Sequence, residues 1–308
     1  MSITVFVDGA VGTTGLEINE RLAGRAEISA ITLDEARRKD PAARAEALND
    51  ADIVILCLPD DAARDAVASI RNPRTRVIDA SSAHRCAEGW TYGFPELERD
   101  APGRIAEARF VANPGCYPTG FLALIRPLVR AGLVPPDWLV STNAVSGYSG
   151  GGKAMIVEFE GGRGSAARAY ALDLAHKHVP EMTRHGGLAH PPIFAPMVAD
   201  TYRGMIVEVP LPLALIPGTP SLAAVRDAIA GAFADQPLVS VVDDDMPAIV
   251  IEENAGTDRL TLRVRGNAAT GQARLIATLD NLGKGAAGAA VQNLNIMAGL
   301  DMLAGLNL

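Results

Sequence analysis

The sequence of residues 3–18 is ITVFVDGAVGTTGLEI. Its apolar start, Ile3–Val7, predicts a buried strand, and a helical pattern begins at Leu16. Glycines between a strand and a helix let the chain turn sharply and let backbone N–H groups approach a pyrophosphate at the positive end of the helix. The G-x-x-G-x-x-G spacing is one residue longer than the commonest fingerprint, so a merely tight turn is the alternative. The segment predicts a dinucleotide-binding turn made by Gly9, Gly12, Thr13, Thr14 and Gly15.

Strands and helices alternate through the first third of the chain. After the first strand, apolar runs predict strands at 28–33, 52–58, 76–80 and 108–112. Strand, helix and strand at this spacing predict an α/β fold with a doubly wound parallel sheet of the Rossmann type.

The pattern changes from about Trp138. Few helices separate the later apolar runs, which predict strands at 205–209, 239–242, 249–252, 260–264 and 274–279. This pattern is typical of a mostly antiparallel sheet in a second, α+β domain. Helical spacing is predicted at 166–174, and again at Ala286–Leu303, where a helix would close the fold.

Composition and charge exclude several classes of protein. The 308 residues contain 28 Lys and Arg against 36 Asp and Glu, which gives a net charge of −8. No basic cluster is present to displace counterions, so we expect neither nucleic acid nor an anionic membrane as a partner. The longest apolar run, 53–58, is too short to span a bilayer. Residues 1–4 do not resemble an export signal, and three cysteines without a C-x-x-C pair indicate reduced thiols, so we expect a cytoplasmic protein.

The ribose end of the predicted nucleotide site carries both signs of charge. Asp34 and Glu35 follow the second strand, where a carboxylate would bind the ribose of NAD. Arg37, Arg38 and Lys39 come next and could neutralise the additional phosphate of NADP. The residues alone leave the two cofactors open.

Cys116 has the position expected of a nucleophile. It lies in the segment NPGCYPTG, residues 113–120, between a strand and an amphipathic apolar pattern, and Pro118 is suited to the first turn of a helix. A helix N-terminus favours the thiolate that attacks a substrate. Cys57, inside an apolar strand, is expected to be inert, as is Cys86 in a polar loop.

Two further segments could complete a site around the cysteine. His176 and His178 lie in HKHVPE, residues 176–181, and either could serve Cys116 as acid and base. A metal site with His185 or His190 is disfavoured because no Cys or carboxylate spacing completes it, so no metal is expected. The glycine-rich loop SGYSGGGK, residues 146–153, offers Ser146, Gly147 and Lys153 to a phosphate, although a flexible linker is equally consistent with it.

With these residues in view, the sequence resembles the N-acetyl-gamma-glutamyl-phosphate reductase family in its shorter form, over nearly the whole chain. The likeness rests on the segments 9–15, 57–60, 79–85, 92–97, 113–120, 146–153, 176–181 and 284–288. The Pro-Gly-Cys-Tyr-Pro-Thr-Gly element is the specific one, whereas the glycine turn occurs in many families.

The resemblance implies an activity, a site and a domain organisation. It implies NADP(H)-dependent reductive dephosphorylation of an acyl phosphate in arginine biosynthesis, by way of a cysteine thioester. Cys116 would be the nucleophile and His176 the acid-base residue, with His178, Ser146, Gly147 and Lys153 at the substrate and Asn281 near the nicotinamide. The nucleotide domain would comprise 1–113 with a returning helix at 285–308, and the catalytic and oligomerisation domain 114–284, resembling that of glyceraldehyde-3-phosphate dehydrogenase. A homo-oligomer, dimer or tetramer, is implied as well.

Three alternatives stay open at this point. An aspartate-semialdehyde dehydrogenase would share the chemistry with a shorter substrate that lacks the acetyl group. A Cys-His hydrolase would use the same nucleophile without reduction. A nucleotide sensor would bind NADPH without turnover.

Overall fold

A computed structural model describes residues 2–308 and divides them into two compact units. Unit 1 comprises the chain up to Pro95, then Asp100–Pro114 and Ala286–Leu306. Unit 2 comprises Glu96–Arg99, Gly115–Gly285 and Asn307–Leu308. The domain bounds drawn from the sequence, 1–113 with 285–308 and 114–284, stay a prediction about which parts fold as units.

Unit 1 contains a six-stranded sheet in which every neighbouring pair is parallel. The strand order is β2-β1-β3-β4-β6-β5, so the chain leaves β1 in one direction and returns to its other side at β3. This reversal is the arrangement in which α/β sheets bind ligands at the carboxyl ends of their strands. The strands are β1 (Ile3–Asp8), β2 (Ile28–Ile31), β3 (Ile53–Leu56), β4 (Arg76–Asp79), β5 (Thr91–Tyr92) and β6 (Phe110–Ala112).

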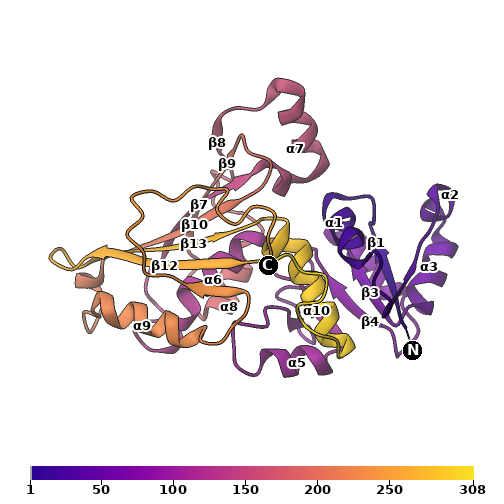
Figure 1. The fold of residues 1–308 in the computed structure, drawn as a ribbon, viewed down its shortest axis with the longest axis horizontal. Coiled ribbons are helices and arrows are strands. Elements are labelled where there is room, and N and C mark those ends of the chain that lie inside the picture. Colours follow the sequence, from indigo (N-terminus) through magenta and orange to yellow (C-terminus); the bar gives the residue numbers. More distant parts are fainter. Residues whose placement is uncertain (1) are drawn as a thin grey trace. The chain divides into compact units, whose positions relative to one another are not determined.

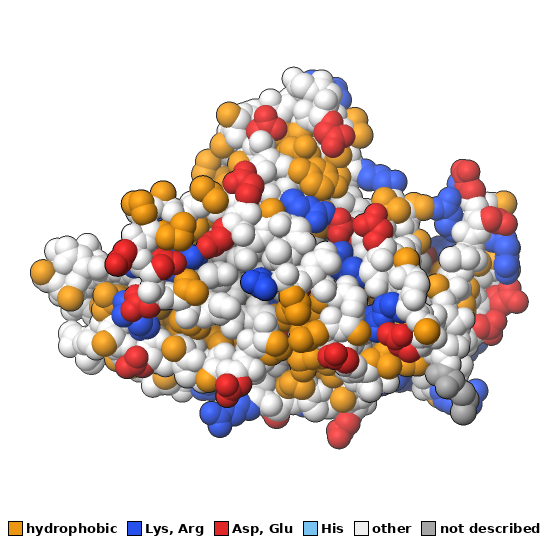
Figure 2. All heavy atoms as spheres, viewed as in Figure 1, with side chains coloured by type: hydrophobic (Ala, Val, Ile, Leu, Met, Phe, Trp, Pro, Cys, Tyr) orange, Lys and Arg blue, Asp and Glu red, His pale blue; other side chains and the backbone are white. Residues whose placement is uncertain are grey.

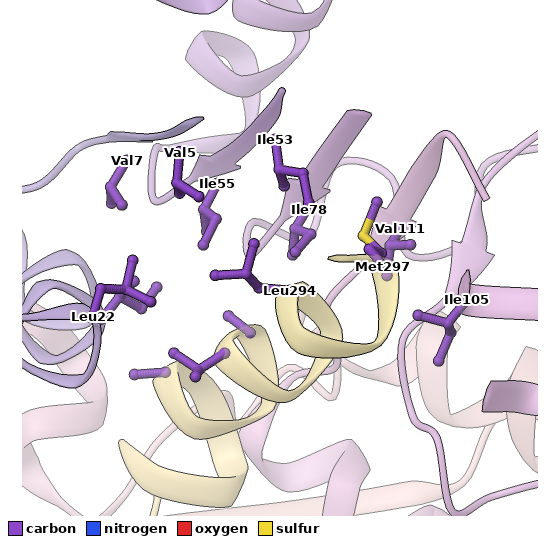
Figure 3. Close-up of a cluster of buried hydrophobic side chains, with 14 residues drawn as sticks. Val5, Val7, Leu22, Ile53, Ile55, Ile78, Ile105, Val111, Leu294 and Met297 are labelled. Atoms are coloured by element: carbon purple, nitrogen blue, oxygen red, sulfur yellow. The ribbon is translucent and has the colours of Figure 1, made fainter. Parts of the chain in front are cut away.

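Helices cover both faces of this sheet, which confirms the doubly wound prediction. The helices of unit 1 are α1 (Thr13–Leu22), α2 (Glu35–Lys39), α3 (Pro41–Asp50), α4 (Asp60–Ser69), α5 (Ala101–Glu107) and α10 (Gly288–Ala298). One apolar cluster joins the strands to α1, α5 and α10, and a second joins them to α3 and α4. Figure 3 shows Leu294 of α10 directed at the strand residues Ile55 and Ile78. All four residues of β3 are apolar and buried, because both faces of this parallel sheet are covered by helices.

Unit 2 contains a seven-stranded mixed sheet in the order β11-β12-β13-β10-β7-β9-β8. Four of its six pairings are antiparallel, and β7–β9 and β11–β12 are parallel. Its strands are β7 (Ser141–Gly147), β8 (Ala167–Ala169), β9 (Ile193–Ala199), β10 (Met205–Leu211), β11 (Val239–Val241), β12 (Leu260–Asn267) and β13 (Gln272–Leu279). The mostly antiparallel second sheet was therefore predicted correctly.

Three helices lie on one side of this second sheet (Figure 1), where α6 and α9 contact its strands and α8 packs on α6. They are α6 (Cys116–Arg130), α8 (Val179–Gly186) and α9 (Leu222–Ala232). On the opposite side, β9 carries the exposed apolar residues Ile193 and Met197. Beyond β7, the chain forms an arm of short helices, η1 (Tyr148–Gly151), α7 (Gly152–Glu158) and η2 (Phe159–Arg163). Two further short turns are η3 (Leu213–Leu215) and η4 (Gly283–Ala287).

Two predicted elements are wrong. The helix predicted at 166–174 is replaced by β8 and a turn in which Ala171 and Leu174 have positive φ, because β8 pairs with β9 and this pairing outweighs helical propensity. The strand predicted at 249–252 is irregular chain. The backbone of Gly204 lies so close to Ile251 there that a Cβ at position 204 would be 2.3 Å from its carbonyl oxygen.

Two surface properties follow from the described residues. Across residues 2–308, no helix combines the length and the apolar character that a bilayer crossing requires. On the face drawn in Figure 2, acidic and basic side chains of the described residues are interspersed rather than gathered by sign.

Candidate active site

Cys116 is the first residue of α6. The chain leaves β6 at Ala112, and the N–H of Asn113 still bonds to Asp79 before Gly115 caps the helix in an extended conformation. Pro118 falls in the first helical turn, where its missing N–H leaves no gap in the hydrogen bonding. The predicted position of the thiol is confirmed, and the positive end of the α6 dipole stabilises a thiolate there.

A buried carboxylate, which the sequence analysis did not single out, supports the turn before Cys116. Oε1 of Glu181, on α8, accepts the backbone N–H of Gly115 at 2.8 Å, and Glu181 is 1% exposed. The available signal was its place in the same short segment as the two histidines. Glu181 thereby ties α8 to the residue that precedes Cys116.

Both histidines lie in the chain just before and at the start of α8, and their ring centroids are 4.7 Å apart. Aromatic rings surround them: Tyr117 lies edge-on to both, and Phe194 lies 5.1 Å from the ring of His176. The backbone N–H of His178 donates to Nδ1 of His176 at 3.1 Å. That hydrogen bond places the lone pair on Nδ1, so neutral His176 carries its proton on Nε2 and presents a donor there.

Two tyrosine hydroxyls form a short chain beside the cysteine. Tyr170 donates to Tyr117 at 2.9 Å, and Tyr117 donates to the carbonyl of Met197 at 3.2 Å. Burial raises the pKa of Tyr170 to about 12, and nearby negative charge at Cys116 adds to the rise. Burial likewise raises the pKa of Tyr117 well above its usual value, and the charges of Tyr170 and Cys116 raise it by smaller amounts. Both phenols are therefore neutral near pH 7 and act as hydrogen-bond donors.

The glycine-rich loop is built differently from the cradle that was predicted. The N–H groups of Gly147, Tyr148 and Ser149 all bond to carbonyl oxygens of the turn at 201–204. A phosphate at this loop would therefore depend on side chains more than on those three N–H groups. Ser146 is buried and its hydroxyl donates to the carbonyl of Gly147 at 3.0 Å, whereas Lys153 is exposed on α7.

Arg203 is a cation near this loop that the sequence analysis missed. A Cβ at Gly147 would lie 2.8 Å from the backbone of Arg203, so the turn and the loop are in direct contact. The guanidinium lies 3.4 Å from Asp280, and its side chain is 22% exposed. No sequence motif marks this arginine, because the contact joins residues more than 50 positions apart.

Asn281 uses its amide to brace the same region. Its Oδ1 accepts the N–H of Gly204 at 3.0 Å, and its Nδ2 donates to Oγ of Ser149 at 2.8 Å. The residue is 2% exposed. Its predicted approach to a nicotinamide stays a prediction, and its observed contacts hold the turn at 201–204 to the loop.

The glycine turn of unit 1 has the geometry that a pyrophosphate needs. Gly9 has φ of +89°, and a Cβ there would lie 2.2 Å from the carbonyl oxygen of Cys57, so only glycine fits. Helix α1 begins at Thr13 without a side-chain cap and without an acidic residue in its first turn. Within the described residues, the first N–H groups of α1 are thus left for an anion, which fits a dinucleotide.

At the predicted ribose end, most of the charged side chains have structural partners. Asp34 caps α2 by accepting the N–H of Arg37, and Lys39 pairs with Glu35 on the surface. Nε of Arg38 is buried and makes no hydrogen bond among the described residues. Among the predicted basic residues, Arg38 is the one with a donor still to be satisfied by a ligand.

The described residues contain no group of three or more His, Cys, Asp or Glu side chains placed to hold a metal ion.

Comparison with known families gives two matches. Residues 32–104 match the model of the semialdehyde dehydrogenase NAD binding domain, and residues 116–281 match that of the semialdehyde dehydrogenase dimerisation domain.

Curated relatives align over nearly the whole chain. An N-acetyl-gamma-glutamyl-phosphate reductase of Burkholderia lata is 52% identical over 303 residues, which cover 96% of each chain. One of Brucella ovis is 50% identical over 309 residues, which cover 97% of this chain and all of the relative.

Solved structures share the fold at low sequence identity. An aspartate semialdehyde dehydrogenase of Francisella tularensis has a TM-score of 0.73 at 14% identity, with 96% of this chain and 100% of the other covered. The enzyme of Candida albicans, solved with NADP, has a TM-score of 0.66 at 16% identity, with 97% and 99% covered. At such identities the likeness bears on the fold alone.

Proposed function

This chain belongs to the N-acetyl-gamma-glutamyl-phosphate reductase family, and from that membership we propose that it catalyses the NADPH-dependent reductive dephosphorylation of N-acetyl-gamma-glutamyl phosphate. The product is N-acetylglutamate 5-semialdehyde, an intermediate of arginine biosynthesis. The observation that carries the proposal is the placement of Cys116 at the start of α6 in the same unit as the His176 and His178 pair. A thiol there is suited to form a thioester. A Cys-His hydrolase would not need the nucleotide turn, and a nucleotide sensor would not need the thiol.

The first step uses the thiolate of Cys116. Its sulfur attacks the acyl carbon, a C–S bond forms, and the bond from carbon to the phosphate oxygen breaks, so that phosphate leaves with its electron pair. We assign the stabilisation of the negative charge that develops on the acyl oxygen to backbone N–H groups at the start of α6. Such donors contribute on the order of 3 to 4 kcal/mol each to transition-state stability.

The second step converts the thioester to the aldehyde. When bound, NADPH supplies a hydride. We assign the Nε2–H of His176 to the oxygen that becomes negative as the acyl carbon is reduced, because Nδ1 already accepts a hydrogen bond. When this oxygen re-forms the carbonyl, the C–S bond breaks, and Cys116 returns to the thiolate. His178, buried at the start of α8, is proposed to contact the substrate.

The leaving phosphate is proposed to lie by Ser146, Gly147 and Lys153. Arg203 is proposed to reinforce this assignment, because the backbone of its turn contacts Gly147 directly and its guanidinium, 3.4 Å from Asp280, adds a positive charge near the loop. Since three N–H groups of the loop are already bonded, the cations supply most of the attraction. Lys153 contributes a point charge from the exposed arm, whereas Arg203 can bind in a forked manner.

The nucleotide is proposed to bind at Gly9, Gly12, Thr13, Thr14 and Gly15, with Asn281 toward the nicotinamide. Arg38 is proposed to favour NADP(H) over NAD(H), since its buried Nε lacks a hydrogen bond that a 2′-phosphate could accept. Asp34 is occupied as a helix cap and is less suited to a free ribose hydroxyl.

The protein is proposed to be a cytoplasmic homo-oligomer, a dimer or tetramer. The side of the unit 2 sheet that lacks helices exposes large apolar side chains, and those of Ile193 and Met197 are 56% and 37% exposed. Leu172 and Leu174, after β8, are exposed as well. Burying such residues against a second copy would remove apolar surface from water, and the matching family model is described as a dimerisation domain.

The reverse reaction tests the proposal. N-acetylglutamate 5-semialdehyde, phosphate and NADP should give NADPH absorbance that depends on phosphate, and NAD should be much the poorer acceptor. Aspartate 4-semialdehyde in its place should react poorly, and a preference for it would instead make the chain an aspartate-semialdehyde dehydrogenase. Binding of NADPH without any change in absorbance would contradict the proposal and favour a sensor.

A further inference from the structure

Unit 2 contains a fully buried ion pair that the proposed chemistry does not use. Nζ of Lys284 lies 2.8 Å from both carboxylate oxygens of Glu96, and each side chain is 1% exposed. Removing two charges from water is costly, and an apolar pair of similar volume is often as stable or more so. The stability of the fold alone therefore does not explain this pair. A role in positioning the segments that carry Glu96 and Lys284 explains it better.

The backbone next to Lys284 contacts the nucleophile. A Cβ at Gly285 would lie 2.8 Å from Cβ of Cys116 and 3.3 Å from its Cα, so the turn leaves no room for a side chain there. Asp280 shapes this turn, because its Oδ1 accepts the N–H groups of Leu282 and Gly283, and its carbonyl accepts that of Gly285. The turn at 283–285 thus lies directly against the start of α6, and we call it the Gly285 wall.

The segment that carries Glu96 is also tied to α6. Glu98, two residues on, pairs with Arg126 at 2.7 Å and with Arg130 at 2.6 Å. Arg130 also donates to the carbonyl of Leu97. Both arginines belong to the helix whose first residue is Cys116. Both partners of the buried pair are therefore connected to Cys116. Glu96 is connected through the ion pairs of Glu98 with α6, and Lys284 is connected through its neighbour Gly285.

We propose that Glu96 and Lys284 are positioning residues that hold the Gly285 wall against Cys116, so that its sulfur keeps one orientation for attack. The kinetic part of this inference rests on the proposed function, whereas the reactivity of the thiol does not. Small displacements of a reacting group are costly, since a misplacement of about 1 Å can lower a rate roughly 100-fold.

The variants are chosen to separate positioning from folding. Glu96→Gln or Lys284→Met alone removes one charge and leaves its opposite buried, which destabilises the fold strongly. The double variant Glu96→Leu/Lys284→Met removes both charges together. The control is Asp243→Asn, which removes the exposed ion pair between Arg226 and Asp243 in the same unit.

Two readouts are combined. Alkylation of Cys116 by iodoacetamide, followed by peptide mass spectrometry across pH 5–10, needs neither cofactor nor substrate, so it remains informative even if the assigned reaction is wrong. Turnover of the semialdehyde with phosphate and NADP gives kcat and KM. For the double variant we expect a Tm near that of the wild type, a kcat lowered roughly 10- to 100-fold, little change in KM and an altered alkylation profile. Asp243→Asn should match the wild type in all of these.

A folded double variant whose alkylation profile and kcat stay within about twofold of the wild type would overturn the proposal. If the double variant does not fold, Gly285→Ala decides, since it leaves both charges in place and inserts a methyl group where the wall meets Cys116. It should change the alkylation profile and lower kcat, and a wild-type profile would overturn the proposal.

Discussion

Cys57 and Cys116 both lie between a parallel strand of unit 1 and a helix, and their surroundings give them opposite chemistry. Cys57 directly follows β3, and its N–H bonds to Asp8 as a continuation of the sheet. Burial around its sulfur raises the pKa of the thiol to about 12, and the charges of Asp79 and Asp8 add to the rise. Cys116 lies three residues further from its strand and is the first residue of α6.

From this difference we infer that the distance of each cysteine from its strand decides its reactivity. A cysteine that still belongs to the sheet faces carboxylates and apolar side chains, whereas a cysteine in the first helical turn is close to unsatisfied N–H groups. Cys57 serves the nucleotide turn through its backbone, since its carbonyl oxygen fills the space where Gly9 lacks a side chain. Cys116 is proposed to serve the site through its sulfur.

Replacing Cys116 should lower kcat more than any other change. A small loss of kcat would contradict the comparison between the two cysteines. We expect Cys116→Ala to lower kcat on the order of 10⁶-fold, as the loss of other covalent nucleophiles does. The reverse assay with semialdehyde, phosphate and NADP measures this, with NADPH binding by fluorescence as the check that the nucleotide turn is intact. A kcat within about tenfold of the wild type would remove the thiol from the mechanism.

The two histidines should give the next largest effects, and different ones. We expect His176→Gln to lower kcat by about 10²- to 10⁴-fold with KM little changed, because Nε2–H is assigned to the developing negative charge. His178→Gln should mainly raise KM for the semialdehyde. Steady-state kinetics of the two variants under the same conditions compare them. A larger loss of kcat in His178→Gln would exchange their roles.

Replacing Cys57 should give the smallest effect. With a pKa of about 12, roughly one molecule in 10⁴ carries the Cys57 thiolate at pH 8, so iodoacetamide should label Cys116 and leave Cys57 unmodified. Cys57→Ser should keep kcat within about twofold and lower the free energy of unfolding by about 1–3 kcal/mol, because the hydroxyl loses water on burial. Rapid labelling of Cys57 in the folded protein would show that the two thiols are not separated in this way.

The sequence predicted unit 1 better than unit 2 because the signals in unit 1 are local. Glycines after an apolar run suffice for the β1–α1 turn, and parallel strands buried on both faces appear as continuous apolar runs. In unit 2 the segment 166–174 has helical propensity but pairs with β9, and the pairing of β7 with β9 joins residues about 50 positions apart. Such pairings leave no local pattern.

The residues of the candidate site also differ in whether a local sequence pattern marks them. Cys116 at a helix start could be predicted because Pro118 and the apolar spacing lie beside it. Glu181 ends the segment that carries the two histidines, but its contact with Gly115 joins distant segments. Arg203 lies in no motif, and its contact with Gly147 also joins distant segments. The loop at 146–153 resembled an open phosphate cradle, but the N–H groups of Gly147, Tyr148 and Ser149 bond to the turn at 201–204.

The thioester on Cys116 can be measured directly. The protein is mixed with N-acetyl-gamma-glutamyl phosphate in the absence of NADPH, quenched in acid, and examined by intact and peptide mass spectrometry. We predict a mass increase of one N-acetylglutamyl group per chain, located on the peptide that contains Cys116 and lost when NADPH is added before the quench. An unmodified Cys116 in protein that nevertheless turns over with NADPH, or an acyl group on another residue, would contradict the account.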